Sequence, residues 1–311
     1  MTKSYDGHLA VRDLSLTVPQ GTVYGLLGPN GSGKTTTIRM IMNIIAPDSG
    51  TVELFGARHT GDELADRVGY LPEERGLYRK MRVRDVLRFL AALKGVDGRT
   101  ADARIDDWLE RLSLRGGGKD WGRARIEELS RGMQQKVQFI AALLHEPDLV
   151  ILDEPFSGLD PMNAQAMKDT VVDLKRQGRT VIFSTHLMDN AERMCDSVCI
   201  IAGGEKVLDG TVPGIKTAAG VGAIALALDG GDRVAVAALL ARSGLTRKVD
   251  DHDRHFEIEL APGVSSGRLL ACLVEAAVPV QRYEIMQPSL HQIFLQRVGA
   301  VGVEDGMSGQ G

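Results

Sequence analysis

The run Gly28-Pro-Asn-Gly-Ser-Gly-Lys-Thr35 is the feature that most constrains what this 311-residue chain can fold into. It fits the pattern G-x-x-x-x-G-K-[ST], and it follows a short apolar run, Thr22–Leu27, and precedes apolar residues at helical spacing. A loop of this kind between a buried strand and a helix belongs to an α/β fold with a parallel sheet. A glycine-rich turn without a ligand is the alternative interpretation, and the order strand, loop, helix favours an anion-binding loop.

The residue types of this loop predict its chemistry. Its glycines allow several backbone N–H groups to point at one anion, and the helix that starts near Gly33 adds a partial positive charge. We expect Lys34 to reach the β- and γ-phosphates of a nucleotide, and the Thr35 hydroxyl to ligate Mg²⁺. The predicted nucleotide-binding residues of the loop are Gly28, Pro29, Asn30, Gly31, Ser32, Gly33, Lys34, Thr35 and Thr36.

A second apolar strand, Leu149–Leu152, ends in the two carboxylates Asp153 and Glu154. Groups at the carboxyl end of a parallel strand face the ligand crevice. Asp153 is expected to hold Mg²⁺ through its water shell, and Glu154 to orient or deprotonate an attacking water. Taken alone, the segment also fits a buried strand capped by solvated acids.

Composition agrees with a soluble globular protein. Apolar residues make up 43% of the chain and charged residues 25%, and the net charge of −4 leaves no broad basic field for a nucleic-acid backbone. No apolar stretch approaches the ~20 residues of a membrane span, and the first residues lack an apolar signal core. We therefore expect a cytoplasmic chain without a nucleic-acid partner.

Length and pattern predict two domains. Residues 1–215 form an α/β domain with a helical insertion at about 75–145, and within it Leu14–Val18 alternates like a half-buried strand. Residues 216–300 show the order strand, helix, strand, strand, helix, strand of an α+β, ferredoxin-like domain. Residues 301–311 are glycine-rich and are expected to form a flexible tail.

Three further motifs stand in order along the first domain: Leu129-Ser-Arg-Gly-Met133, Ser157-Gly-Leu-Asp160 and Ser184-Thr-His186. With them, nearly all of residues 5–215 resembles the ATP-binding subunit of ABC transporters, whose signature is LSGGQ. The resemblance implies a P-loop NTPase core with an antiparallel β subdomain, and ATP hydrolysis that is coupled to transport.

The resemblance also implies roles for individual residues. Tyr5 stands where the family stacks an aromatic ring on adenine, and an ordinary edge aromatic is the other interpretation. His186 matches the switch histidine and joins Glu154 as a catalytic residue, whereas a lone histidine at a strand end otherwise makes local hydrogen bonds. Asp160 matches the D-loop, and with Pro161 it also fits the start of a helix; the two roles can coexist.

The signature region departs from the family pattern. Ser130, Arg131 and Gly132 are the predicted nucleotide contacts there, and Ser130 is also placed to cap the following helix. Arg131 and Met133 replace a glycine and a glutamine. Glu73 stands where the family has the Q-loop glutamine: its carboxylate can join the Mg²⁺ shell, yet it adds negative charge near Asp153, so its coupling role is open.

Both departures resemble a subset that carries a C-terminal accessory domain and pairs with a separate membrane permease, as in sodium- and drug-efflux systems. The resemblance implies that two chains, in a homodimer or in a heterodimer with a related ATPase, stack head to tail on the inner face of the cell membrane. Each ATP then lies between the P-loop of one chain and Ser130–Gly132 of the other.

The alternative function is a soluble ABC ATPase that acts on ribosomes or DNA. Translation factors of that type carry two cassettes per chain, and chromosome-maintenance ATPases insert long coiled coils; this chain has one cassette and no sustained heptads. A P-loop kinase leaves the signature and the D-loop unexplained. Neither the transported solute nor the role of the C-terminal domain follows from the residues.

Overall fold

The computed structural model describes residues 1–59, 62–74, 76–220 and 223–307. The chain divides into two compact units, Met1–Thr211 and Val212–Gly311. This division lies four residues before the boundary predicted near residue 215. Each unit buries an apolar cluster of its own.

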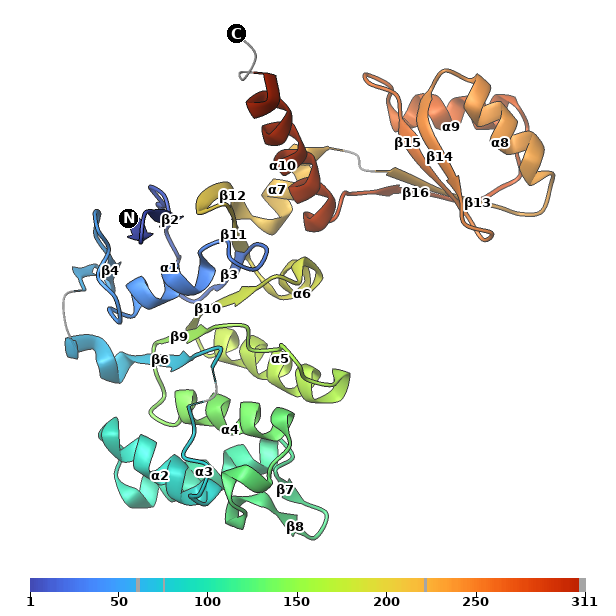
Figure 1. Cartoon of the computed structure of the whole chain (residues 1–311). Helices are drawn as coiled ribbons and strands as arrows, with labels where there is room; N and C mark the ends of the chain where they lie inside the picture. Colours follow the sequence, from blue (N-terminus) through green and yellow to red (C-terminus); the bar gives the residue numbers. More distant parts are fainter. Residues whose placement is uncertain (60–61, 75, 221–222, 308–311) are drawn as a thin grey trace. The chain divides into compact units, whose positions relative to one another are not determined.

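A six-stranded sheet forms the centre of the first unit (Figure 1), in the order β12-β11-β3-β10-β9-β6. Its strands are β3 (Val23–Leu27), β6 (Val68–Leu71), β9 (Leu149–Leu152), β10 (Thr180–Thr185), β11 (Ser197–Ala202) and β12 (Glu205–Thr211). All neighbours are parallel except β11 and β12. Because only β10 separates β3 from β9, the residues that follow these two strands meet at one edge of the sheet.

Helices and short hairpins complete the first unit. The helices are α1 (Lys34–Ile41), α2 (Val83–Leu93), α3 (Gly98–Arg111), α4 (Arg131–Leu143), α5 (Pro161–Arg176) and α6 (Met188–Met194). The antiparallel hairpins are β1 (Lys3–Tyr5) with β2 (His8–Val11), β4 (Glu53–Leu54) with β5 (Ala57–Arg58), and β7 (Arg115–Gly116) with β8 (Lys119–Asp120). Short 3₁₀ helices cover Asp62–Arg67, Trp121–Arg123 and Ile126–Glu128.

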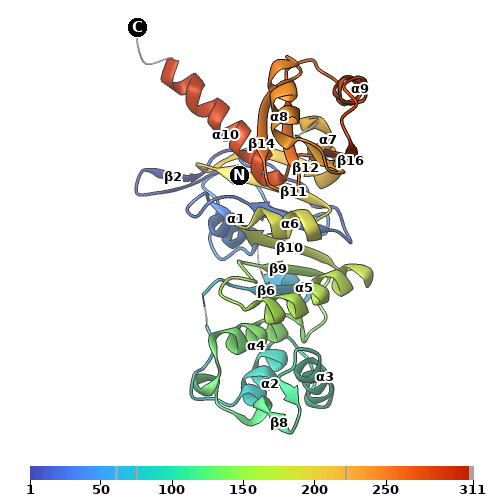
Figure 2. The same cartoon turned by 90° about the vertical axis from the view of Figure 1, so that its right-hand side faces the viewer.

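The predicted helical insertion is present as α2, α3 and α4. These three helices lie together beyond the edge strand β6, as both views show (Figure 1 and Figure 2). Helix α4 is capped where the sequence predicts it: the Ser130 hydroxyl accepts a hydrogen bond from Met133 N. Within the described ranges, no helix is long and apolar enough to cross a bilayer.

The prediction of a strand at Leu14–Val18 is wrong, because this segment joins no β-ladder of the described chain. The alternation itself is real: Leu14 is buried, while Leu16 and Val18 pack partly buried against the core of the first unit. Alternation specifies which side chains face the core, but it does not specify a neighbouring strand that supplies backbone hydrogen bonds. In this part of the chain the paired strands are β1 and β2.

The second unit confirms the ferredoxin-like prediction. Its elements run β13 (Ala223–Leu228), α8 (Arg233–Arg242), β14 (Thr246–Asp251), β15 (Phe256–Leu260), α9 (Ser266–Glu275) and β16 (Val280–Met286). The antiparallel sheet has the order β14-β15-β13-β16, so each β-α-β unit is split by a strand inserted from elsewhere in the chain. Apolar residues of α8 and α9 share one buried cluster with the strands.

Two more helices belong to this unit, α7 (Val212–Ala219) and α10 (Leu290–Met307). Helix α10 continues into the segment for which the sequence predicts a flexible tail. Residues 301–307 have helical backbone, because extending an existing helix adds a hydrogen bond for each residue fixed. Residues 308–311 lie outside the described part of the chain.

His145, in the loop between α4 and β9, predicts a pH effect on stability. Its Nε2 lies 3.1 Å from the Val68 carbonyl oxygen, and its buried Nδ1 has no hydrogen-bond partner in the described structure. Burial lowers the pKa of His145, the Val68 bond and Asp66 raise it, and Lys94 and Arg104 lower it. Since the unfolded state then binds the proton more readily, the free energy of unfolding should fall as the pH drops below ~6.5.

Denaturant unfolding at pH 7.5 and 5.5 measures this effect. The wild-type chain should lose more stability between the two pH values than His145→Gln does, since glutamine does not titrate. His252→Gln, at an exposed site in the second unit, is the control and should keep the wild-type loss. An equal loss in wild type and His145→Gln would contradict the prediction.

Candidate nucleotide-binding site

The P-loop connects β3 to α1, and two of its glycines have positive φ angles and lie close against backbone carbonyls. Gly28 has a φ of 151° and Gly33 a φ of 103°. A Cβ on Gly28 would lie 2.1 Å from the Ile201 carbonyl oxygen, and one on Gly33 would lie 2.4 Å from the Ala10 carbonyl oxygen. Only glycine fits both positions, because both the φ values and the space exclude a side chain.

Lys34, the first residue of α1, turns its amine back over the loop. Its Nζ donates to the carbonyl oxygens of Gly28 at 2.8 Å and Pro29 at 3.0 Å, and it lies 3.9 Å from Glu154 Oε1. The side chain is only 6% exposed. Burial lowers the pKa of Lys34, while the carboxylates of Glu154, Asp153 and Glu73 raise it. The ammonium is thus held among acceptors at the start of a helix.

The two carboxylates after β9 are anchored by β10. The Ser184 hydroxyl donates to Asp153 Oδ1 and accepts a hydrogen bond from Glu154 N at 2.9 Å. Asp153 is fully buried, and its Oδ2 has no partner in the described structure. Glu154 has a φ of 47°, which is unusual for a residue with a side chain.

His186 meets one of these carboxylates. Its Nδ1 lies 3.0 Å from Glu154 Oε1, the same oxygen that faces Lys34. The strand β10 therefore supplies Ser184 from its end and His186 just beyond it, and both contact the segment after β9. The pair predicted from the sequence, Glu154 and His186, is in direct contact.

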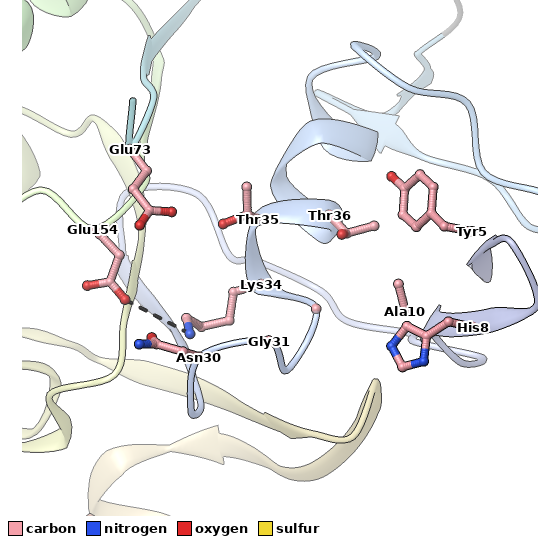
Figure 3. Close-up of a pocket in the computed structure, with 11 residues that line it drawn as sticks. Tyr5, His8, Ala10, Asn30, Gly31, Lys34, Thr35, Thr36, Glu73 and Glu154 are labelled. Carbon is pink, nitrogen blue, oxygen red and sulfur yellow. Dashed lines mark ion pairs between the residues drawn. The ribbon is translucent and has the colours of Figure 1, made fainter. Parts of the chain in front are cut away.

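Lys34 and Glu154 line a pocket of about 490 Å³ (Figure 3), whereas Asp153, Ser184 and His186 lie behind Glu154 and are not among the described lining residues. Figure 3 shows Lys34, Glu154 and Glu73 at one end and Tyr5 at the other. The residues that line the pocket are Tyr5, His8, Ala10, Asn30, Gly31, Gly33, Lys34, Thr35, Thr36, Glu73 and Glu154. The pocket thus brings together most of the predicted P-loop residues, both glutamates and the aromatic ring.

Sequence reasoning missed His8 and Ala10 in this lining. Tyr5 and His8 are paired across the β1–β2 hairpin, and the connecting Asp6 and Gly7 have φ values of 46° and 82°. An Asp-Gly pair with positive φ at both residues is typical of a two-residue hairpin turn. This dipeptide was the available signal, because a two-residue turn after Tyr5 places residue 8 directly opposite it.

The oxygen groups fit a hard divalent cation. The unpartnered Asp153 Oδ2 is buried, and the Thr35 and Glu73 side chains line the adjoining pocket. Carboxylate and hydroxyl oxygens are the donors that Mg²⁺ takes in nucleotide sites. The donor set is therefore suitable for Mg²⁺.

The signature residues and Asp160 lie elsewhere. None of Ser130, Arg131, Gly132 and Asp160 is among the lining residues that the structure describes. A Cβ on Gly132 would lie 3.2 Å from Leu159 Cδ2, so the signature approaches the segment that carries Asp160. Asp160 caps α5 by accepting from Asn163 N at 3.0 Å, as Pro161 at the next position suggested, and this bond lowers the pKa of Asp160.

Comparison with known proteins agrees with these observations. The family model described as "ABC transporter" matches residues 11–157, and the model "ATP-binding protein DrrA1-3-like, C-terminal domain" matches residues 210–298. The ABC transporter ATP-binding protein YhaQ of Bacillus subtilis, itself called uncharacterized, is 40% identical over 97% of both chains. The daunorubicin resistance ATP-binding protein DrrA3 of Streptomyces coeruleorubidus is 31% identical over 96% of this chain and 93% of its own.

A further relative is the Nod factor export ATP-binding protein I of Burkholderia lata, with 32% identity over 96% of this chain and 94% of its own. Among solved structures, an ATP-binding subunit of an ABC transporter has 31% identity and a TM-score of 0.61, covering 70% of this chain and 90% of its own. CbiO1 of Clostridium perfringens has 25% identity and a TM-score of 0.60, with 70% and 88% covered. The chain therefore belongs to the ABC transporter family and is one of its ATP-binding subunits, an ATPase.

Proposed function

We propose that this chain is the motor of an exporter: two copies bind ATP between them, and hydrolysis drives a separate membrane permease from its cytoplasmic face. The observation that carries the proposal is the division of the predicted contacts. Six P-loop residues, Glu73 and Glu154 line the pocket, and Asp153 and His186 adjoin Glu154, whereas the signature residues and Asp160 do not line it. A pocket that lacks the predicted signature contacts needs a second surface to supply them.

Within one copy, the P-loop is proposed to hold the phosphates. Lys34 contacts the β- and γ-phosphates once its amine leaves the carbonyls of Gly28 and Pro29, and the loop N–H groups bind the phosphate oxygens. At the opposite end Tyr5 stacks on adenine. Bound Mg²⁺, held through Thr35, Asp153 and Glu73, supplies positive charge that offsets the negative charge of the phosphates.

The glutamate and the histidine are proposed to carry out the chemistry. Glu154 orients the attacking water and accepts its proton. The hydrogen bond from Glu154 N to the Ser184 hydroxyl fixes the backbone and so keeps the carboxylate at the pocket edge. His186, in contact with Glu154 Oε1, holds that carboxylate and contacts the γ-phosphate. Loss of the γ-phosphate removes charge-assisted hydrogen bonds to His186 and to Ser130 of the second copy, so the two copies part.

The permease and the direction of transport are supported by the relatives. Two proteins that resemble this chain over nearly its full length are named for drug resistance and for Nod factor export. The helices α2, α3 and α4, which follow the loop of Glu73, are proposed to pass the motion on. The acidic net charge of −4 argues against the alternative of a soluble ATPase on ribosomes or DNA.

Co-purification tests this proposal. A tagged full-length chain, expressed in the cells that make it naturally, should sediment with membranes and be isolated with one multi-spanning protein. When both are reconstituted in vesicles, the ATPase rate should rise above that of the chain alone. Sedimentation with ribosomes or nucleoid, and no membrane partner after crosslinking, would refute the proposal.

A further inference from the structure

Two glutamines of α4 reach the loops that carry the glutamates of the pocket. Gln135 and Gln138 are three residues apart and so lie on neighbouring parts of one helix face. Both are more than nine-tenths buried, with 4% and 6% of their surface exposed. The helix begins immediately after Ser130, the predicted contact to the nucleotide of a second copy.

Each glutamine bonds to the backbone one residue beyond a pocket carboxylate. Gln138 Nε2 donates to the Glu74 carbonyl oxygen at 3.1 Å, directly after Glu73. Gln135 Nε2 donates to the Pro155 carbonyl oxygen at 3.4 Å, directly after Glu154. Glu73 follows β6 and Glu154 follows β9, which are different strands of the sheet, yet a single helix contacts the loops after both.

Neighbouring side chains of α4 make different contacts. Gln134 Nε2 donates to the carbonyls of Ile126 and Leu129, and Lys136 Nζ donates to the Leu112 carbonyl at 2.7 Å. These carbonyls belong to the helical insertion and not to the pocket. Contact with the carboxylate loops is therefore a property of Gln135 and Gln138 within this row.

The burial of Gln138 is not explained by packing alone. Its Oε1 is buried and has no hydrogen-bond partner in the described structure. A buried unpaired amide oxygen is unfavourable, and an apolar side chain of similar size would avoid that cost. The amide therefore lowers the stability of the fold, and the hydrogen bond from Gln138 Nε2 to the Glu74 carbonyl oxygen is the contact that a functional role would explain.

We propose that Gln135 and Gln138 are positioning residues, which set the places of Glu154 and Glu73 relative to the P-loop from the helix that starts at the signature. The inference rests on the proposed function, since it assigns the two glutamates to the ATPase site. A shift of α4 when Ser130 binds a nucleotide is then transmitted to both carboxylates, and each copy senses the nucleotide of the other.

Substitutions that remove the donor test this role. Gln138→Met keeps the length of the side chain but removes the N–H donor, and Gln138→Glu puts a carboxylate acceptor in place of that donor. Gln135→Met removes the donor to the second loop, the one after Glu154. Each should lower kcat for ATP hydrolysis by about 10-fold or more, because small misplacements of catalytic groups are costly. The dissociation constant for ATP should change by less than about threefold, since the P-loop is untouched.

Gln165→Met is the matched control. Gln165 lies exposed on α5 and bonds only to Asp169 within the described chain, so kcat and affinity should stay at the wild-type values. The unfolding temperature without nucleotide reports on the fold of each variant. If one substitution at 138 prevents folding, the other and Gln135→Met still decide the question.

A double-mutant cycle separates positioning from a structural role. In a Glu73→Ala background, Gln138→Met should cause little further loss of kcat, because the side chain that it positions is already gone. If the fold-losses of kcat in the two single variants multiply in the double variant, the inference is overturned. A wild-type kcat in both Gln135→Met and Gln138→Met would overturn it as well. A wild-type chain without ATPase activity would instead overturn the proposed function.

Discussion

Replacing Glu154 with glutamine is expected to reduce kcat for ATP hydrolysis by about 10²- to 10⁴-fold, the range that a general base contributes. Glutamine preserves the shape of the side chain but cannot accept a proton from water. The backbone bond from Glu154 N to the Ser184 hydroxyl is unaffected, so the geometry of the loop should persist.

Affinity for ATP should survive this substitution. The P-loop and Lys34 are unchanged, and the loss of one negative charge 3.9 Å from the Lys34 amine leaves that amine freer to bind a phosphate. Steady-state kinetics and titration with a fluorescent ATP analogue measure the two quantities. Glu205→Gln, on the exposed edge strand β12 and paired with Arg12, is the control and should be as active as wild type. Hydrolysis by Glu154→Gln at the wild-type rate would remove Glu154 from the mechanism.

Replacing Lys34 with alanine is expected to weaken ATP binding itself, by roughly 10- to 100-fold, which corresponds to the loss of one or two hydrogen bonds to a charged group. Lys34 is the only lysine or arginine among the lining residues that the structure describes. Without it, the carboxylates of Glu154 and Glu73 face the phosphates with no basic side chain between them.

Thermal unfolding gives a second measure of the same loss. A ligand that binds only the folded state raises the unfolding temperature according to its concentration relative to its dissociation constant. The rise that ATP causes in the wild-type chain should largely vanish in Lys34→Ala. Lys248→Ala, an exposed change in the second unit, should retain it. Equal rises in Lys34→Ala and wild type would show that the amine does not bind the nucleotide.

Local features of the chain could be predicted well from its sequence. The P-loop, the strand before it and the capping roles of Ser130 and Asp160 depend on residues within a few positions of each other, and all four appear in the structure. The ferredoxin-like order of the second unit follows from strand and helix periods alone, and the sheet order agrees with it.

Features that depend on distant backbone could not be predicted. Leu14–Val18 has the alternation of a strand, but only the folded chain decides that β2 and not this segment finds a pairing partner. The contact of Gln138 with the Glu74 carbonyl joins residues 64 positions apart, and no local pattern marks it. His8 is the intermediate case: the Asp6-Gly7 turn that pairs it with Tyr5 is a local signal, whereas the position of this hairpin at the pocket depends on the folded chain.

Light scattering on Glu154→Gln tests the central claim, that ATP joins two copies, most directly. With saturating ATP and magnesium, the mass in solution should rise from one chain to two, and it should return to one when the nucleotide is removed. Glu154→Gln carrying the additional change Lys34→Ala should stay at one chain. A mass of one chain at full occupancy of the Glu154→Gln pocket would contradict the account.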